Sequence, residues 1–411
     1  WTSSNEAVAT VDNTGKVTAV ADGYAIITAT CGNVSATCTV ESCFSVVNAD
    51  GVTIYYRTTS STAPYTVEVT HKDESYNSYS GNVNIPNSVT KSGVTYSVTS
   101  IGYSAFEDCN DLTSVTIPNS VTEIGQSAFR NCTGIASINI PNSVTTFRAY
   151  AFYGCSTFTS FTIPNSVTSI GEGAFYYCTG LTSMTIPESV TLIEHRAFSG
   201  CSGLTAFYGK YASADNRCLI VNGSLLAFAP SGLTSYDIPN YVTSIGGGTF
   251  EEYTGLTSVT IPASVTSIGY GAFQNCTRLT SMTIPNSVTK IEGCTFYGCS
   301  GLTSVTIPNT ITEIGIYAFY NCKGLTSVTI PASITSIGGC AFLDCTNLKK
   351  VINCSALNIV KRSTTYGYVA YYADQIITGV RAESITLNKT NLTLKASETE
   401  TLVATVKPDN T

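Results

Sequence analysis

Apolar residues recur along most of this chain with a fixed period of 23 residues. From Leu112 to Ile117, β-branched apolar residues alternate with small polar ones, which predicts a short strand with one buried face. The proline that follows cannot donate to a ladder and should end the strand. Val121 and Ile124 predict a second short strand. The Ala-Phe-x-x-Cys segment after Gly125, with apolar residues three to four positions apart, predicts a single helical turn.

Phenylalanine marks the period in two blocks of five. The first block contains Phe106, Phe129, Phe152, Phe175 and Phe198, and the second contains Phe250, Phe273, Phe296, Phe319 and Phe342. The 52-residue interval between the blocks holds one 23-residue unit and one longer unit of 29 residues at about 204–232. The longer unit contains CLIVNGSLLAF, whose two apolar runs meet at Asn222-Gly223. This predicts a β-hairpin with a type I′ turn.

A 23-residue unit of this kind buries too little apolar surface to fold alone, so neighbouring units must stack. We therefore expect a mainly β solenoid, in which each coil has short strands plus a helical turn. Both blocks should belong to one continuous stack of about 11 coils, roughly 50 Å long at the usual spacing of strands. The 29-residue unit should interrupt this pattern without ending the stack.

Composition narrows the class of partner. Only 11% of the 411 residues are charged, the net charge is −7 and there is no block of basic residues, so nucleic acid is not an expected partner. No apolar run approaches the roughly 20 residues that a membrane-spanning helix needs, so no direct membrane span is expected. The first residue is Trp1 rather than methionine, which indicates an excised piece of a longer protein.

The motifs L-x-x-V-x-I-P, V-x-x-I-G and A-F-x-x-C resemble the BspA-like leucine-rich repeat of bacterial surface proteins. The resemblance implies a repeat solenoid over residues 101–352. It also implies an N-terminal β cap over residues 43–100, because Tyr76–Gly102 resembles the β-hairpin cap of that family. Residues 353–380, where the period breaks, correspond to a C-terminal cap.

Both ends of the chain resemble bacterial immunoglobulin-like domains. Residues 1–42 are similar to the later strands of such a domain, and residues 381–411 are similar to the opening strands of a second one. Each end is thus part of a β-sandwich. Tandem modules in one long surface protein would give this arrangement. A head-to-tail contact between copies through the two partial ends is the weaker alternative.

A cysteine row accompanies the phenylalanines. Nine of the 16 cysteines share one position of the repeat, and Tyr253 takes the tenth place: Cys109, Cys132, Cys155, Cys178, Cys201, Cys276, Cys299, Cys322 and Cys345. Coils about 4.8 Å apart lie within the Cα range of a disulfide, but parallel side chains leave the Cβ atoms farther apart than the usual ~3.5–4.5 Å. A straight row does not converge on a metal ion. We expect buried, reduced thiols that fill space, and no metal or cofactor.

Three cysteines off the row are better suited to a disulfide. Cys31, Cys38 and Cys43 lie near the boundary of the first module, and we expect any true disulfide partners among them.

The residues that flank the Ala-Phe pair differ between otherwise similar units, and several of them are tyrosine. Because tyrosine offers a large contact area at low entropic cost, this edge gives candidate ligand-binding residues. The candidates are Tyr150, Tyr153, Tyr176, Tyr177, Tyr297, Tyr317 and Tyr320. The alternative is that these rings only stack on one another along the solenoid. The outward Ser/Thr face of the first strand, with Ser160 and Thr162 as examples, is uniform and discriminates poorly between ligands.

By family resemblance the chain is an adhesin-like, non-enzymatic protein at the bacterial cell surface or outside the cell. Its partner would be a protein or glycan of the host matrix or of another cell. A purely structural stalk is the main alternative. A carbohydrate-active enzyme is disfavoured because His71 and His195 lack a motif. Glu251 and Glu252 are neighbours on a turn that should point apart.

Overall fold

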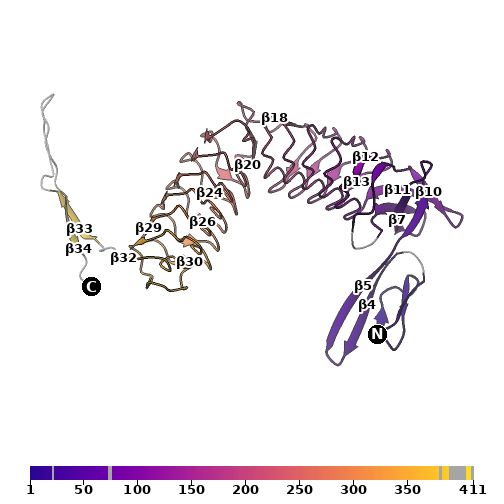
Figure 1. The fold of residues 1–411 in the computed structure, drawn as a ribbon, viewed down its shortest axis with the longest axis horizontal. Helices are drawn as coiled ribbons and strands as arrows, with labels where there is room; N and C mark the ends of the chain where they lie inside the picture. Colours follow the sequence, from indigo (N-terminus) through magenta and orange to yellow (C-terminus); the bar gives the residue numbers. More distant parts are fainter. Residues whose placement is uncertain (21–22, 73–75, 379–381, 388–403, 409–411) are drawn as a thin grey trace. The chain divides into compact units, whose positions relative to one another are not determined.

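The computed structural model describes residues 1–20, 23–72, 76–378, 382–387 and 404–408 (Figure 1). The chain divides into two compact units. The first is Trp1–Leu233 with Ser244–Tyr253, and the second is Thr234–Thr243 with Thr254–Thr411. All regular secondary structure is β, and the described residues contain no helix. The mainly β fold class is therefore confirmed, whereas the expectation of one continuous stack stays a prediction.

Two small antiparallel sheets form the N-terminal part of the first unit. Their strands are β1 (Thr2–Ser3), β4 (Gly23–Cys31) and β5 (Val34–Ser42) in one sheet, and β2 (Ala9–Val11) and β3 (Val17–Ala19) in the other. The apolar side chains of Val8, Ala9, Ala25 and Ile27 are buried together. This part therefore has a small core of its own, as expected for strands of a β-sandwich.

The register of the β4–β5 hairpin separates the three cysteines that were expected to form a disulfide. Cys38 pairs with Ile27, four residues from Cys31, which places the two cysteines about 13 Å apart. Cys43 follows directly after β5, five residues from Cys38 along an extended strand, or about 16 Å. A disulfide needs Cα atoms within about 7 Å. The expectation of a bridge among these three cysteines is wrong for this fold.

The predicted N-terminal cap shares a sheet with the first coils of the solenoid. Its strands are β6 (Phe44–Val47), β7 (Thr53–Ser60), β8 (Thr66–Thr70), β10 (Ser88–Lys91) and β11 (Val94–Ile101), and β9 (Gly81–Asn84) pairs with the first coil instead. β11 lies between β8 and β13 (Glu123–Ile124), parallel to both. The ladder of the cap thus passes without a break into the ladder of the repeats.

Each coil contributes up to two short parallel strands to two ladders. The first ladder contains β12 (Leu112–Thr116), β16 (Ser183–Ile186) and β18 (Ala206–Gly209) in the first unit, and β21 (Ser235–Asp237), β23 (Ser258–Thr260), β25 (Ser281–Thr283), β27 (Ser304–Thr306), β29 (Ser327–Ile330), β31 (Lys350–Asn353) and β32 (Gln375–Thr378) in the second. The second ladder contains β13 (Glu123–Ile124), β14 (Thr146–Phe147), β15 (Ser169–Ile170), β17 (Leu192–Ile193) and β22 (Ser244–Ile245) in the first unit, and β24 (Ser267–Ile268), β26 (Lys290–Ile291), β28 (Glu313–Ile314) and β30 (Ser336–Ile337) in the second.

The register of these ladders equals the sequence period. Glu123 pairs with Thr146, and Thr146 pairs with Ser169, so equivalent residues of successive units lie side by side. The strands appear as stacked coils within each unit (Figure 1). This is the stacking that the 23-residue pattern predicts.

The repeated phenylalanines form a ladder of nearly parallel rings in the core of each unit. From Phe106 to Phe198 the ring centroids of successive coils are 5.0, 5.6, 5.3 and 5.4 Å apart. From Phe273 to Phe342 the distances are 5.5, 5.2 and 5.0 Å. These values lie close to the spacing of hydrogen-bonded strands, about 4.8 Å. The ring stack and the backbone ladders therefore reinforce the same spacing.

The 29-residue unit contains a β-hairpin at the position that the sequence predicts. β19 (Cys218–Val221) and β20 (Ser224–Phe228) pair in antiparallel fashion. The turn residues Asn222 and Gly223 have φ angles of 50° and 81°, as a type I′ turn requires. The ring of Phe228 lies 4.9 Å from that of Phe250 and so takes the place of the missing repeat phenylalanine.

The Ala-Phe-x-x-Cys segment is not the helical turn that its spacing suggested. A helix would direct its N–H groups to carbonyls four residues back, whereas alternate N–H groups here donate to the next coil. The N–H groups of Ser104, Phe106 and Asp108 donate to the carbonyls of Gln126, Ala128 and Arg130, at 2.8–3.0 Å. Two residues of this turn, Ser104 and Asp108, have φ angles of 50° and 57°. The segment is a pair of tight turns with left-handed residues.

The predicted C-terminal cap adds a further rung to the first ladder. β31 and β32 pair in parallel over four residues each. The N–H of Phe342 donates to the carbonyl of Gly367 at 2.7 Å, as it would to the next repeat. Further along, β33 (Ala382–Leu387) and β34 (Ala404–Pro408) form an antiparallel pair. The rest of the predicted second immunoglobulin-like segment lies outside the described residues.

Within the described part of the chain, no helix is long and apolar enough to cross a membrane.

We expect Phe152→Ala to lower the free energy of unfolding by about 3–5 kcal/mol, because it removes a fully buried ring stacked between Phe129 and Phe175. Urea unfolding monitored by circular dichroism measures the change. Thr162→Ala on the exposed face of the same coil is the matched control and should stay within about 0.5 kcal/mol of the wild type. Equal losses for both variants would show that the ring ladder does not hold the stack.

Candidate ligand-binding surface

The structure brings the seven candidate tyrosines together as two clusters, one in each unit. The first tyrosine cluster consists of Tyr150, Tyr153, Tyr176 and Tyr177. The Tyr153 ring makes edge contacts with Tyr150, Tyr176 and Tyr177, with ring centroids at 6.2, 5.3 and 5.8 Å. Tyr176 and Tyr177 are stacked at 4.4 Å. These four rings form one continuous aromatic surface across two adjacent coils.

The second tyrosine cluster consists of Tyr297, Tyr317 and Tyr320. Tyr297 and Tyr320, at the same position of successive coils, stack at 4.8 Å, and Tyr317 contacts Tyr320 edge-on at 5.7 Å. The Tyr320 hydroxyl also hydrogen-bonds the Asp344 carboxylate, which raises the pKa of that tyrosine.

Three candidate tyrosines occupy left-handed backbone positions. Tyr150 and Tyr177 have φ angles of 58°, and Tyr317 has 55°. Such angles are uncommon for bulky residues and unstrained for glycine. Glycine occupies the equivalent positions in other coils, at Gly173 and Gly200. The fold therefore fixes the backbone at these positions and leaves the side chain free to vary.

The rings at these positions lie over the glycine of the next coil. A Cβ atom added to Gly173 would lie 2.5 Å from the Tyr150 ring, and one added to Gly200 would lie 2.7 Å from the Tyr177 ring. Both tyrosines are half-buried for this reason. The contact supports the packing interpretation for the covered side of each ring.

Polar partners hold the first tyrosine cluster in place. The Tyr150 hydroxyl donates to Glu172 Oε1 at 3.1 Å, and the Tyr176 hydroxyl donates to Glu251 Oε1 at 2.8 Å. The guanidinium of Arg130 lies 5.1 Å from the centre of the Tyr153 ring, within cation–π range. Burial, followed by the effect of the neighbouring carboxylates, raises the pKa of the Tyr176 and Tyr177 hydroxyls. These hydroxyls remain protonated donors at neutral pH.

Glu251 is a residue of this site that the sequence did not reveal. Its side chain is buried and forms an ion pair with Arg196, with 3.2 Å between Nε and Oε2. Burial raises the pKa of the Glu251 carboxyl, and the nearby Arg196 opposes that rise. Each of the two carboxylates is hydrogen-bonded to a tyrosine hydroxyl, Glu251 to Tyr176 and Glu252 to Tyr177. The sequence did not predict these contacts, because each pair is 75 residues apart.

The exposed rings on these turns belong to other tyrosines. Tyr103 and Tyr270 are each 48% exposed, whereas Tyr317 is 36% exposed and the other six candidates are less exposed. On these turns, tyrosines that lie close together in the sequence contact one another, whereas Tyr103 and Tyr270 face solvent.

The cysteine row has a structural role beyond filling space. All nine thiols are buried, and most donate to the carbonyl of the repeat phenylalanine in the preceding coil. The Sγ–O distances are 2.9 Å for Cys132, 3.0 Å for Cys155, Cys201 and Cys345, and 3.1 Å for Cys178, Cys299 and Cys322. Tyr253, in the tenth place, directs its hydroxyl to the equivalent carbonyl of Phe228 at 2.8 Å. This position of the repeat therefore favours a side chain that can donate a hydrogen bond to that carbonyl.

Burial also determines the acidity of the row. It raises the pKa of Cys201 and Cys345 to about 12, and it raises the pKa of Cys132, Cys178 and Cys322 well above the ordinary value. Thiols in this state are poor nucleophiles and poor metal ligands. In the described ranges, no group of three or more His, Cys, Asp or Glu side chains is placed to hold a metal ion.

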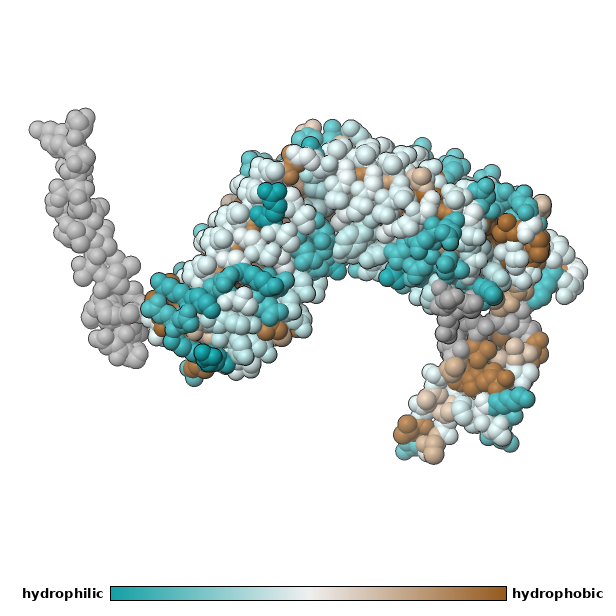
Figure 2. Space-filling model, viewed as in Figure 1, coloured by the Kyte–Doolittle hydropathy of each residue, from teal (hydrophilic) through white to brown (hydrophobic). Residues whose placement is uncertain are grey.

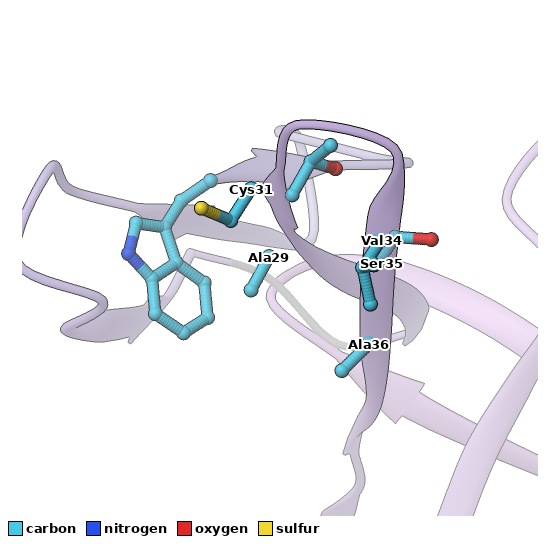
Figure 3. Close-up of a pocket in the computed structure, with 7 residues that line it drawn as sticks. Ala29, Cys31, Val34, Ser35 and Ala36 are labelled. Atoms are coloured by element: carbon cyan, nitrogen blue, oxygen red, sulfur yellow. The ribbon is translucent and has the colours of Figure 1, made fainter.

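A shallow apolar pocket of about 400 Å³ lies at the tip of the β4–β5 hairpin, where Ala29, Cys31 and Ala36 line it together with Trp1 (Figure 3). It is shallow and open, and no charged side chain lines it.

The fold and these sites define a parallel β-solenoid repeat protein with an immunoglobulin-like part at one end. A family model described as BspA type Leucine rich repeat region matches residues 75–205 and 225–370, and one described as Bacterial Ig-like domain (group 2) matches residues 1–42. The first match covers more than half of the chain, which therefore belongs to the BspA-type leucine-rich-repeat family. The BspA-type resemblance and the immunoglobulin-like resemblance of residues 1–42 are confirmed, whereas that of residues 381–411 stays a prediction. No curated protein matches the chain.

Two solved structures are similar to this chain. One is a leucine rich cell surface protein of Faecalibacterium prausnitzii, with 29% identity and a TM-score of 0.52, covering 77% of this chain and 96% of that one. The other is the pneumococcal vaccine antigen PcpA, with 20% identity and a TM-score of 0.57, covering 78% of this chain and 90% of that one. The likeness to PcpA shows the fold alone.

The buried thiols predict a loss of stability at alkaline pH. Because the folded-state pKa of Cys201 is raised from 9.0 to about 12, the native chain keeps a proton that the unfolded chain releases above pH 9.0. The free energy of unfolding should fall by about 1.4 kcal/mol per such thiol for each pH unit between the two values. Urea unfolding under reducing conditions at pH 10 and 11, between the two pKa values, measures this slope.

Cys201→Ser keeps a hydroxyl donor for the Phe175 carbonyl and removes the titration, so the slope should become shallower by about 1.4 kcal/mol per pH unit. Cys31→Ser, at an exposed cysteine, is the control and should leave the slope unchanged. An unchanged slope in Cys201→Ser contradicts the buried-thiol interpretation.

Proposed function

We propose that this chain is an adhesin-like protein at the bacterial cell surface or outside the cell. Its repeat solenoid binds a protein or glycan of the host matrix or of another cell, without catalysis. Membership of the BspA-type family supports this function, as does similarity to a protein described as a leucine rich cell surface protein. The immunoglobulin-like part would act as a spacer.

One observation carries the proposal. Tyrosine stands at left-handed turn positions where neighbouring coils have glycine and where the fold asks for no side chain. A tyrosine there adds backbone strain on the order of 1 kcal/mol. If backbone conformation were the only constraint, glycine would be expected at these positions. The first tyrosine cluster concentrates four half-exposed rings and their hydroxyls on two adjacent coils. Rigid rings of this kind are common anchors at binding surfaces.

The structural stalk remains the second candidate because a specific observation favours it. The rings of Tyr150 and Tyr177 cover the glycine of the next coil, and Tyr176 is bonded to the buried Glu251. Contacts of this kind would also stabilise a solenoid that binds nothing.

The variants Tyr150→Gly and Tyr177→Gly separate the two functions. Glycine is the natural residue at the equivalent positions of the next coils, so each change removes a ring without introducing backbone strain. If the cluster binds, we expect each variant to weaken binding by about 2 kcal/mol and to change the melting temperature little. Binding is measured on an array of extracellular-matrix proteins and glycans, followed by calorimetry with the member that binds.

Ser160→Ala and Thr162→Ala, on the uniform exposed strand face, are the controls and should leave affinity unchanged. A lower melting temperature with unaltered affinity in the tyrosine variants would assign the rings to packing. An array on which the wild-type chain binds no member would favour the stalk.

A further inference from the structure

A polar groove lies where the N-terminal cap meets the first coils. It has a volume of about 530 Å³, within the range of about 300–1,000 Å³ that is typical of small-ligand sites. Its lining includes Arg57 and Glu68 from the cap, Tyr103 and Glu123 from the first two coils, and Arg148. Figure 2 shows a concentration of hydrophilic side chains on the first unit close to the cap.

Charged side chains on the floor of the groove neutralise one another. Arg57 pairs with Glu68 across β7 and β8, with 2.5 Å between Nε and Oε1. Arg148 binds Glu123 through two contacts, 2.7 Å from Nε to Oε1 and 3.3 Å from Nη2 to Oε2. The four side chains together carry no net charge, so the groove offers no net electrostatic attraction to an anionic or a cationic ligand.

The same pairs can hydrogen-bond a neutral ligand. Of the five N–H groups of the Arg148 guanidinium, two are used by Glu123, and each carboxylate oxygen retains a lone pair. The exposed amide of Gln126 adds a donor and an acceptor beside them. Donors and acceptors placed side by side suit adjacent hydroxyl groups, which both donate and accept.

One aromatic ring forms a wall of the groove. Tyr103 is 48% exposed and, in contrast to the two tyrosine clusters, contacts no other ring in the described part of the chain. A flat exposed ring next to paired polar side chains matches a sugar, whose ring presents C–H groups on one face and hydroxyl groups at its edge. We infer that this groove is a binding site for a neutral oligosaccharide, with Tyr103 as the stacking platform.

This site is separate from the tyrosine clusters, and its test is separate as well. The full chain is titrated calorimetrically with cellohexaose, maltohexaose and mannohexaose as neutral probes, and with a heparin hexasaccharide and a lysine-rich peptide as charged probes. We expect at least one neutral hexasaccharide to bind at millimolar concentrations or below. Its affinity should not change between low and high salt, because a neutral ligand has no ion pair with the groove to screen.

Tyr103→Ala should weaken that binding by about tenfold, whereas Tyr103→Phe should retain most of it. Tyr270→Ala is the matched control, because Tyr270 occupies the same position of its unit and is also 48% exposed. It should leave the affinity unchanged. Melting temperatures of both Tyr103 variants should equal that of the wild type, since the ring faces solvent. That of Tyr270→Ala should be slightly lower, because the change also removes the hydroxyl that accepts a hydrogen bond from the Cys294 thiol at 2.9 Å.

Three results overturn the inference. The first is that no neutral hexasaccharide binds. The second is that only a charged probe binds, with an affinity that falls with salt. The third is that Tyr103→Ala and Tyr270→Ala have the same effect on a neutral probe.

Discussion

Neighbouring coils exchange backbone hydrogen bonds, from N–H to carbonyl, and the rest of the structure depends on this exchange. It operates in the two strand ladders, and it operates equally in the tight turns, where the N–H of Phe129 donates to the carbonyl of Ala151 at 2.8 Å. Coils joined in this way approach to about the strand spacing. A Cβ atom on Gly125 would lie 2.6 Å from the carbonyl oxygen of Ile101, so glycine suits this close approach. The same position holds Arg148, Glu194 and Glu292 in three other coils, which accommodate a side chain there.

The exchange also explains which residues can differ between units. Inward positions carry the phenylalanine rings and the thiol donors. Several hydroxyl groups of the repeat are used internally, as where Ser143 donates to the carbonyl of Val121 at 2.5 Å and Thr145 to that of Thr122 at 3.4 Å. The turn positions outside these contacts are free to vary without loss of a bond between coils. Both tyrosine clusters and Tyr103 occur at these variable turn positions.

Much of the fold could be predicted from the sequence, because the spacing of Phe106 and its equivalents reports the stacking directly. The hairpin followed from the Asn222-Gly223 pair. The conformation of the Ala-Phe-x-x-Cys segment could not be predicted, since a helical turn and two left-handed turns place apolar residues at similar intervals. The donor role of the thiols was hidden for another reason. A cysteine chosen to fill space and a cysteine chosen to donate to a carbonyl look alike until Tyr253 is seen to make the same bond.

The candidate site was predicted less well because its partners come from distant parts of the chain. Concentration of tyrosine in sequence correctly located two clusters of rings. It said nothing about Glu251, whose carboxylate reaches Tyr176 past two coils, the Phe198 coil and the hairpin coil with its shortened turn. Nor could it single out Tyr103, whose groove is completed by Arg57 and Glu68 from the cap. Partners supplied by non-equivalent elements leave no trace in a periodic pattern.

The hairpin coil shows what replaces the backbone exchange where it is missing. Two residues separate Leu225 from Phe228, whereas four separate Ile124 from Phe129, so this coil lacks the first left-handed turn. Side chains of the flanking coils make the connection instead. Ser199 Oγ donates to the carbonyl of Gly248 at 2.6 Å.

The missing turn of the hairpin coil also places the charged side chain of Glu251 in the interior. The ion pair of Arg196 with Glu251 and the hydroxyl of Tyr176 compensate the burial of that carboxylate, which would otherwise be costly. The first tyrosine cluster therefore depends on the missing turn of the hairpin coil, and the same cluster could not form on another coil. The second cluster, held by ring stacking between equivalent positions, carries no such dependence.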